Sequence, residues 1–171
     1  MENKELINTL QFLFAQPAEV YAQLKGSSQF SKLTGRLDFF PLWNGTVIMA
    51  RVTGLPSNPG ACASDIFGFH IHGGNSCEGD DSTPAFPKTG EHYNPGTCSH
   101  PEHAGDLPPL FGNGGFAFQI FYTDRFVPEE IIGKTVVIHS APDDFTSQPS
   151  GNSGEKIACG EIKSTWNMSE S

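Results

Sequence analysis

Five of the six histidines in this chain of 171 residues fall within the 39 residues from Gly68 to Asp106. Two of them, His70 and His72, are separated by a single residue, and side chains two positions apart on a β-strand point to the same face. Both imidazoles can then reach one ion, while Phe69 and Ile71 point to the opposite face and can enter a core. The crowding of histidines predicts a metal site.

A second group of metal-binding side chains follows in a segment rich in Gly, Pro and Asn, and consists of His92, His100, His103 and Asp106. Three imidazoles and one carboxylate form a closed tetrahedral set, the geometry that zinc prefers in structural sites. The sixth histidine, His139, ends the apolar run 135–138, which is typical of a buried strand. It can return to the face of His70 and His72, so the sequence predicts two metal sites.

The alternatives are weaker. A single histidine on a strand is more often a hydrogen-bonded structural residue than a ligand. A His-x-His pair followed by His-x2-His-x2-Asp in a loop makes coincidence a poor explanation. For Asp106 alone, a turn-forming aspartate before Leu107 and Pro108 remains a fair alternative.

Several segments together resemble the signature segments of the copper/zinc superoxide dismutase family, in that family's order and with the ligand-loop spacing of its bacterial members. They are residues 68–72, 90–95, 103–107, 133–139, 151–154 and 157–160. The resemblance extends over roughly residues 20–162. It implies an all-β fold, a Greek-key β-sandwich or barrel of about eight antiparallel strands with two long functional loops, the architecture known for this family.

The resemblance also implies the ligands. Copper would be bound by His70, His72, His92 and His139, and zinc by His92, His100, His103 and Asp106, so that His92 would be shared by both ions. Asp143 matches the family's aspartate that hydrogen-bonds one copper ligand and one zinc ligand. Its alternative is a solvated acidic loop residue beside Asp144.

Two departures from the family pattern stand out. Lys156 takes the place of the usual active-site arginine, and a lysine is a mobile point charge that cannot reproduce the guanidinium fork. Its alternative role is that of an ordinary surface lysine. Only two residues separate His100 from His103, a shorter spacing than the family's commonest form, so this loop must turn tightly to hold zinc.

The predicted activity is that of an antioxidant oxidoreductase, which converts superoxide to oxygen and hydrogen peroxide by copper redox cycling beside a histidine-bridged zinc. His92 and Lys156 are its candidate catalytic residues. The alternatives are a catalytically weak or inactive relative that stores or handles copper and zinc, and a structural sandwich with vestigial histidines. Against a copper carrier, Met1, Met49 and Met168 form no thioether cluster of the kind that handles Cu(I).

Composition and periodicity fit one globular domain, with residues 1–17 as a helical N-terminal extension and residues 18–171 as the dismutase-like domain. Short apolar runs separated by turn residues, without alternating helices, favour an all-β sandwich or barrel.

The dipeptide Asn44-Gly45 predicts a hairpin with a type I′ turn. The residues between 73 and 109, and between 140 and 156, are expected to be functional loops because unpatterned segments of that length usually are.

Nineteen acidic residues against ten basic ones give a net charge of −9, which argues against nucleic acid as a partner. The first residues contain Glu2 and Glu5, fit a signal peptide poorly and are too short and polar to span a membrane. We therefore expect a cytoplasmic protein without membrane association. Paired subunits are common in the family, which leaves a homodimer open.

The four cysteines, Cys62, Cys77, Cys98 and Cys159, allow three full pairings. The resemblance selects Cys77 with Cys159. For Cys62 and Cys98, a second disulfide and two buried thiols both stay open.

Overall fold

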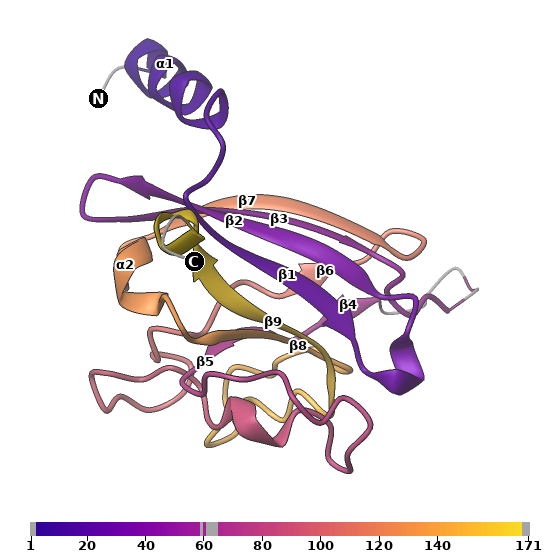
Figure 1. Cartoon of the computed structure of the whole chain (residues 1–171). Helices are drawn as coiled ribbons and strands as arrows, with labels where there is room; N and C mark the ends of the chain where they lie inside the picture. The colour runs from indigo at the N-terminus through magenta and orange to yellow at the C-terminus, as the bar shows by residue number, and fades with distance from the viewer. Residues whose placement is uncertain (1–2, 59, 61–64, 169–171) are drawn as a thin grey trace.

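The computed structural model describes residues 3–58, 60 and 65–168, and within them the fold is an antiparallel β structure (Figure 1). Seven strands form one curled sheet in the order β5-β8-β9-β1-β2-β3-β7, and β4 pairs with β6 in a small second sheet. The bounds are β1 (Val20–Gly26), β2 (Thr34–Leu42), β3 (Gly45–Thr53), β4 (Ile66–Phe67), β5 (Phe69–His72), β6 (Leu110–Phe111), β7 (Phe116–Thr123), β8 (Thr135–His139) and β9 (Lys156–Ser164). The predicted all-β fold is confirmed.

The core lies where the two halves of the curled sheet face each other. Alternate residues of β1, β2 and β3 meet alternate residues of β5, β8 and β9 in one buried cluster that includes Leu24, Leu37, Ile48, Phe69, Ile71, Ile138 and Ile157. Fully burying an aliphatic or aromatic side chain of this size stabilises the fold by about 1.5–3 kcal/mol. The remaining face of β5, β8 and β9 is therefore free to carry polar side chains.

Two α-helices flank the sheet, α1 (Asn3–Phe14) and α2 (Pro128–Ile131), together with the short 3₁₀ helices η1 (Ser28–Phe30), η2 (Pro87–Thr89) and η3 (Thr165–Met168). The predicted N-terminal helix is α1. It projects from the sheet (Figure 1), and only part of its apolar face, Leu10, Leu13 and Phe14, packs on side chains of β2 and β3. In the described residues, no helix is long and apolar enough to span a membrane.

The predicted hairpin forms between β2 and β3, but its turn lies one residue earlier than predicted. Leu42 pairs with Gly45, so the two turn residues are Trp43 and Asn44, and of these only Trp43 has a positive φ, 53°. The type I′ turn at Asn44-Gly45 was therefore wrong. Gly45 is needed for packing, because a Cβ there would collide with the carbonyl oxygen of Thr123 on β7.

The strand boundaries near Gly68 and Thr34 depend on neighbouring segments. Gly68 separates β4 from β5: its amide donates to the Ala141 carbonyl (2.8 Å) and its carbonyl accepts from the His139 amide (2.8 Å). Strand β2 begins at Thr34, after η1. Strand β6 and helix α2 were not predicted, since two and four residues are too few to show a periodicity.

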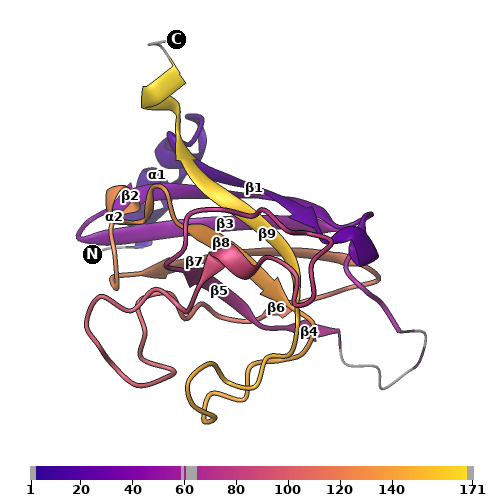
Figure 2. The same cartoon turned by 60° about the horizontal axis from the view of Figure 1, so that its bottom comes forward.

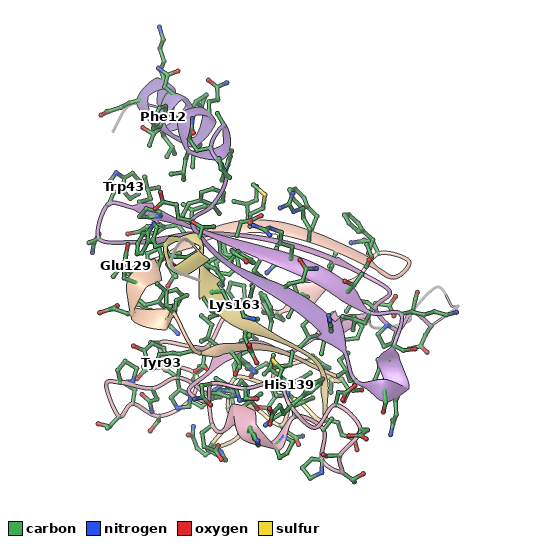
Figure 3. The ribbon with its side chains drawn as sticks, in the orientation of Figure 1. Phe12, Trp43, Tyr93, Glu129, His139 and Lys163 are labelled. Carbon is green, nitrogen blue, oxygen red and sulfur yellow. A yellow bond between two sulfur atoms is a disulfide. The ribbon has the colours of Figure 1, made fainter. Side chains whose placement is uncertain are left out.

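Two long connections gather at one end of the molecule, beneath β5 and β8, as Figure 2 shows. One joins β5 to β6 and the other joins β8 to β9. In Figure 3, His139 lies at this end, whereas Phe12 of α1 lies at the opposite end. The loops predicted to be functional therefore cover the same face of β5 and β8.

Candidate metal centre

Strand β5 places two histidines on the face that the loops cover. Phe69 and Ile71 are fully buried in the core, while His70 and His72 point to the other side and are 0% and 2% exposed. On the neighbouring strand, Ile138 pairs with Phe69 and shares its core-facing side. The next residue of β8, His139, therefore faces the same side as the two β5 histidines.

The first loop is tied to β5 by backbone hydrogen bonds. The Tyr93 amide donates to the Ile71 carbonyl, and the Ile71 amide donates to the Gly105 carbonyl, both at 2.8 Å. Residue 105 is glycine because a Cβ there would collide with the Ile71 carbonyl oxygen. These bonds hold His92 and Asp106, each next to an anchored residue, alongside β5.

Two groups of potential ligands result. The four-histidine group consists of His70, His72, His92 and His139, and the three-histidine group consists of His92, His100, His103 and Asp106. In each group, one ligand atom from every residue lies within 4.8 Å of the others. His92 belongs to both groups. The structure thus brings together all seven residues that the sequence singled out as metal ligands.

The residues fit metal ions, because four buried ring nitrogens have no hydrogen-bond partner among the described residues: Nδ1 of His70, Nε2 of His92, Nδ1 of His100 and Nδ1 of His103. A buried polar atom without a partner costs about 1–3 kcal/mol. Two of these nitrogens, Nδ1 of His70 and Nε2 of His92, belong to the four-histidine group. The other nitrogen of the His92 ring, Nδ1, donates to Asp106 (2.7 Å). A metal ion would supply the missing partners.

The remaining atoms of the four-histidine group face each other. Nε2 of His72 and Nε2 of His139 are 3.2 Å apart. Nδ1 of His72 donates to the Gly90 carbonyl (2.8 Å), and Nδ1 of His139 donates to the Gly154 carbonyl (3.4 Å). These bonds fix the tautomers, so that both Nε2 atoms present lone pairs to the same point.

Burial keeps these rings neutral. Desolvation, reinforced by His139, holds the pKa of His72 well below its usual value. Desolvation and the proximity of His70 lower the pKa of His139 to about 3. An imidazole must be neutral to bind a metal, so His72 and His139 are ready to do so at neutral pH.

Asp143 connects the two groups. Its Oδ2 accepts from Nε2 of His70 (2.7 Å) and its Oδ1 accepts from Nε2 of His100 (2.9 Å). Burial would raise the pKa of Asp143, but the hydrogen bonds from His70, the Phe145 amide and His100 outweigh it and lower the pKa to about 2. Gly151, with φ 67°, allows this approach, because a Cβ there would collide with Asp143 Oδ1.

The short loop between His100 and His103 does turn tightly enough to bring both rings to one point. Their Nδ1 atoms lie 3.1 and 3.3 Å from Asp106 Oδ2, although neither contact has hydrogen-bond geometry. Asp106 Oδ2 instead accepts from the His103 amide (3.0 Å). Burial would raise the pKa of Asp106, but the hydrogen bond from His92 and the nearby histidines lower it, so the carboxylate is charged.

The family model described as copper/zinc superoxide dismutase (SODC) matches residues 33–162, which is more than half of the chain. The chain belongs to the copper/zinc superoxide dismutase family. The cofactors of this family are copper and zinc, the ions that the four-histidine and three-histidine groups suit.

Named relatives cover most of the chain. "Superoxide dismutase [Cu-Zn] 2" of Aquifex aeolicus is 31% identical over 165 residues, which are 88% of this chain and 90% of the relative. "Superoxide dismutase [Cu-Zn]" of Deinococcus radiodurans is 33% identical over 149 residues, 77% of this chain and 78% of the relative. "Superoxide dismutase [Cu-Zn] 1" of Aquifex aeolicus is 30% identical over 167 residues, 89% and 92% of the two chains.

Lys156, which replaces the arginine usual in the dismutase family, begins β9 as the cross-strand partner of His139. Its Nζ donates to Thr89 Oγ1 at 2.6 Å, and the Phe86 carbonyl oxygen lies 3.5 Å away. Burial lowers the pKa of Lys156, and the negative charge of Glu91 opposes that effect. The ammonium is thus held, partly buried, beside the four-histidine group.

The disulfide that the dismutase resemblance selected is present. Cys77 and Cys159, 82 residues apart, are bonded and tie the first loop to β9. Phe86 and Val137 pack against this disulfide. Cys98 is exposed, so the alternative of a buried thiol there was wrong. Cys62 lies outside the described residues, so a bond between those two cysteines stays a prediction.

Three residues that support the dismutase site were missed. Thr89 holds Lys156. Gln148 of the second loop brackets His100, accepting from its amide (3.0 Å) and donating to its carbonyl (2.7 Å). Nη1 of Arg125 donates to the carbonyls of His103 (2.9 Å) and Pro101 (3.1 Å). Nothing in the sequence marks them, because each hydrogen-bonds a partner that only folding brings near.

Proposed function

We propose that this protein is a copper/zinc superoxide dismutase, which converts two superoxide ions and two protons to one oxygen and one hydrogen peroxide. The observation that carries this function is the placement of His92. Its Nδ1 donates to Asp106, and its Nε2 is buried without a hydrogen-bond partner among the described residues. The centroid of its ring is 3.9 Å from that of His70, and the residue belongs to both ligand groups. A protein that only stored metal would have no use for a shared ring.

In this proposal, His70, His72, His92 and His139 hold copper and His92, His100, His103 and Asp106 hold zinc. When bound, copper would supply one-electron oxidation and reduction, and zinc would supply a fixed positive charge. The protein residues set the geometry. Asp143 orients one ring of each group, His70 and His100. The carbonyls of Gly90 and Gly154 orient His72 and His139.

The second role of His92 concerns protons, since the net reaction consumes two. Nε2 of His92 is buried and has no hydrogen-bond partner among the described residues. An imidazole nitrogen exchanges its proton near neutral pH. We therefore assign to this atom the delivery of one proton to the reduced product: Nε2 would carry that proton only while it does not hold copper, and would be free to bind again once the proton has left.

The substrate is an anion, and the protein carries a net charge of −9. A local positive charge is needed to attract it, since local fields raise encounter rates by about 10- to 1000-fold. Lys156 lies beside His139 and supplies this charge. We propose that it guides superoxide into the four-histidine group.

Metal analysis combined with a superoxide-consumption assay tests this function. Protein purified without added metal, and then loaded, is expected to hold one copper and one zinc and to consume superoxide. Both metals without turnover would instead support a protein for metal storage or handling. A folded protein that takes up neither metal would support a structural sandwich, and either result overturns the proposal.

We also propose a second copy of this chain as a partner. Strand β7 exposes Phe116, Phe118, Ile120 and Tyr122, each 38–53% exposed, and Trp43 packs edge-on against Tyr122. Since an aromatic side chain buries about 150–250 Å², covering this stripe would remove ~500 Å² per copy. A stable interface buries about 800 Å² on each partner, so a polar rim around the stripe would complete a homodimer.

A further inference from the structure

Lysine is a poor choice for a fixed guiding charge, because its ammonium sits on a flexible stem of four carbons. In this protein the ammonium of Lys156 is nevertheless tethered. Its shortest hydrogen bond, 2.6 Å, goes to Thr89 Oγ1. The second, to the Phe86 carbonyl, is a weak 3.5 Å contact.

The direction of the Thr89 bond follows from its other partner. Thr89 is fully buried, and its hydroxyl donates its single proton to the Phe86 carbonyl at 3.0 Å. The oxygen therefore has only lone pairs left, and it can only accept from Lys156. The backbone amide of Thr89 also donates to the Phe86 carbonyl (3.2 Å), and the Gly74 amide donates to the Thr89 carbonyl (2.7 Å), so the backbone that carries the hydroxyl is held on two sides.

The same short segment positions a member of the four-histidine group. Gly90, which directly follows Thr89, accepts from Nδ1 of His72 at 2.8 Å. Lys156 itself pairs across the strands with His139. Residues 89 and 90 thus fix the ammonium and one imidazole relative to each other.

We propose that Thr89 is a positioning residue for the reaction: its hydroxyl holds the Lys156 ammonium at the four-histidine group, where the anionic substrate must arrive. The proposal rests on the proposed function for its substrate. An arginine at this position would be oriented by the several donors of its planar guanidinium. The bond to Thr89 gives the ammonium of a lysine a fixed position in another way.

The test compares Thr89→Val, which keeps the shape and removes the hydroxyl, with Thr89→Ser, which keeps the hydroxyl. In the metal-loaded protein at low ionic strength, Thr89→Val is expected to lower kcat/KM for superoxide about three- to tenfold, and Thr89→Ser to restore most of it. Thr46→Val is the matched control, because Thr46 is also fully buried and its hydroxyl donates to a backbone carbonyl, that of Phe126 (2.9 Å), away from both ligand groups.

A second measurement separates positioning from a general loss of structure. In a Lys156→Ala background, Thr89→Val is expected to change kcat/KM no further, because the group that it positions is gone. Equal losses with and without Lys156, or an unchanged rate in Thr89→Val alone, would overturn the proposal.

Azide, a small monovalent anion, provides a readout that does not depend on turnover. Its affinity for copper-loaded protein is expected to fall in Thr89→Val by a factor similar to that in Lys156→Ala, and to stay unchanged in Thr46→Val. Wild-type protein that holds both metals but does not consume superoxide would refute the proposed function alone. Azide binding that is insensitive to Thr89→Val would refute the role of Thr89 alone.

Discussion

Lys156 carries the positive charge that this site presents to an anion, and its partial burial has a consequence for pH. Burial lowers its pKa, with Glu91 opposing the effect, whereas an ordinary lysine has a pKa of about 10.4. The ammonium is charged below its pKa and neutral above it. Guidance is therefore present at neutral pH and is lost on the alkaline side, earlier than for an exposed lysine.

Lys156→Ala is expected to lower kcat/KM for superoxide by about tenfold at low ionic strength and to weaken its dependence on salt. Lys156→Arg is expected to move the alkaline decline to higher pH, because the guanidinium keeps its proton. Superoxide decay measured against pH and ionic strength checks both. Lys88→Ala serves as the control, since Lys88 is exposed and paired with Glu78. A rate that is unchanged in Lys156→Ala rules out guidance.

Asp143 can be tested separately from the loop that carries it. Asp143→Asn is expected to weaken binding of both copper and zinc by about 10- to 100-fold, as removal of carboxylates behind metal-bound histidines does. Competition with chelators of known affinity measures this. Asp144→Asn is the matched control, because that carboxylate accepts from Thr146 and Ser147 and from neither ligand group. Equal affinities in the two variants would contradict the role of Asp143.

At the scale of elements, the segment between β7 and α2 supports the short zinc-binding loop from outside. Arg125, which lies in it, donates to the carbonyls of Pro101 and His103. Arg125→Ala is expected to weaken zinc binding by about tenfold, because the loop loses the bonds that hold His103 in place. Metal-buffer titration checks the affinity. Arg51→Ala, which removes an arginine paired with Asp38 on the sheet, should leave zinc binding as it is.

The disulfide joins the first loop to β9. Replacing both Cys77 and Cys159 by serine is expected to lower the free energy of unfolding by about 2–5 kcal/mol, although the entropic share of that loss depends on the model used. Denaturant unfolding of the metal-free protein measures it without a contribution from ion binding. A loss under about 1 kcal/mol would show that the packing of Phe86 and Val137 holds the loop without the bond.

Most strands and the ligand groups could be predicted because they depend on local spacing. His70 and His72 lie on the same face of any strand that contains them. The apolar run 135–138 before His139 indicates a buried strand whatever its neighbours are. The predicted hairpin turn was wrong at Gly45, because the need for glycine there comes from the carbonyl of Thr123, which is far away in sequence. The roles of Thr89, Gln148 and Arg125 could not be predicted for the same reason, since each hydrogen-bonds a partner that only folding brings near.

At the scale of the whole molecule, the apolar stripe on β7 predicts self-association. Phe118→Glu and Ile120→Glu are each expected to convert a dimer to a monomer, because a charge buried at the centre of such an interface has no partner. Sedimentation at tens of micromolar protein measures this. Phe12→Glu is the control, since Phe12 is 72% exposed on α1, which projects from the sheet (Figure 1). Monomeric wild-type protein, or dimers in both variants, would contradict the interface.

One carboxylate, that of residue 143, touches a ring from each ligand group. Ordering it for one ion removes part of the entropic cost of ordering it for the other. Thermodynamic linkage then requires the benefit to be mutual, so that zinc raises the affinity for copper by the same factor as copper raises that for zinc. Loading should therefore be cooperative, with singly metallated molecules scarce at every stage of a titration.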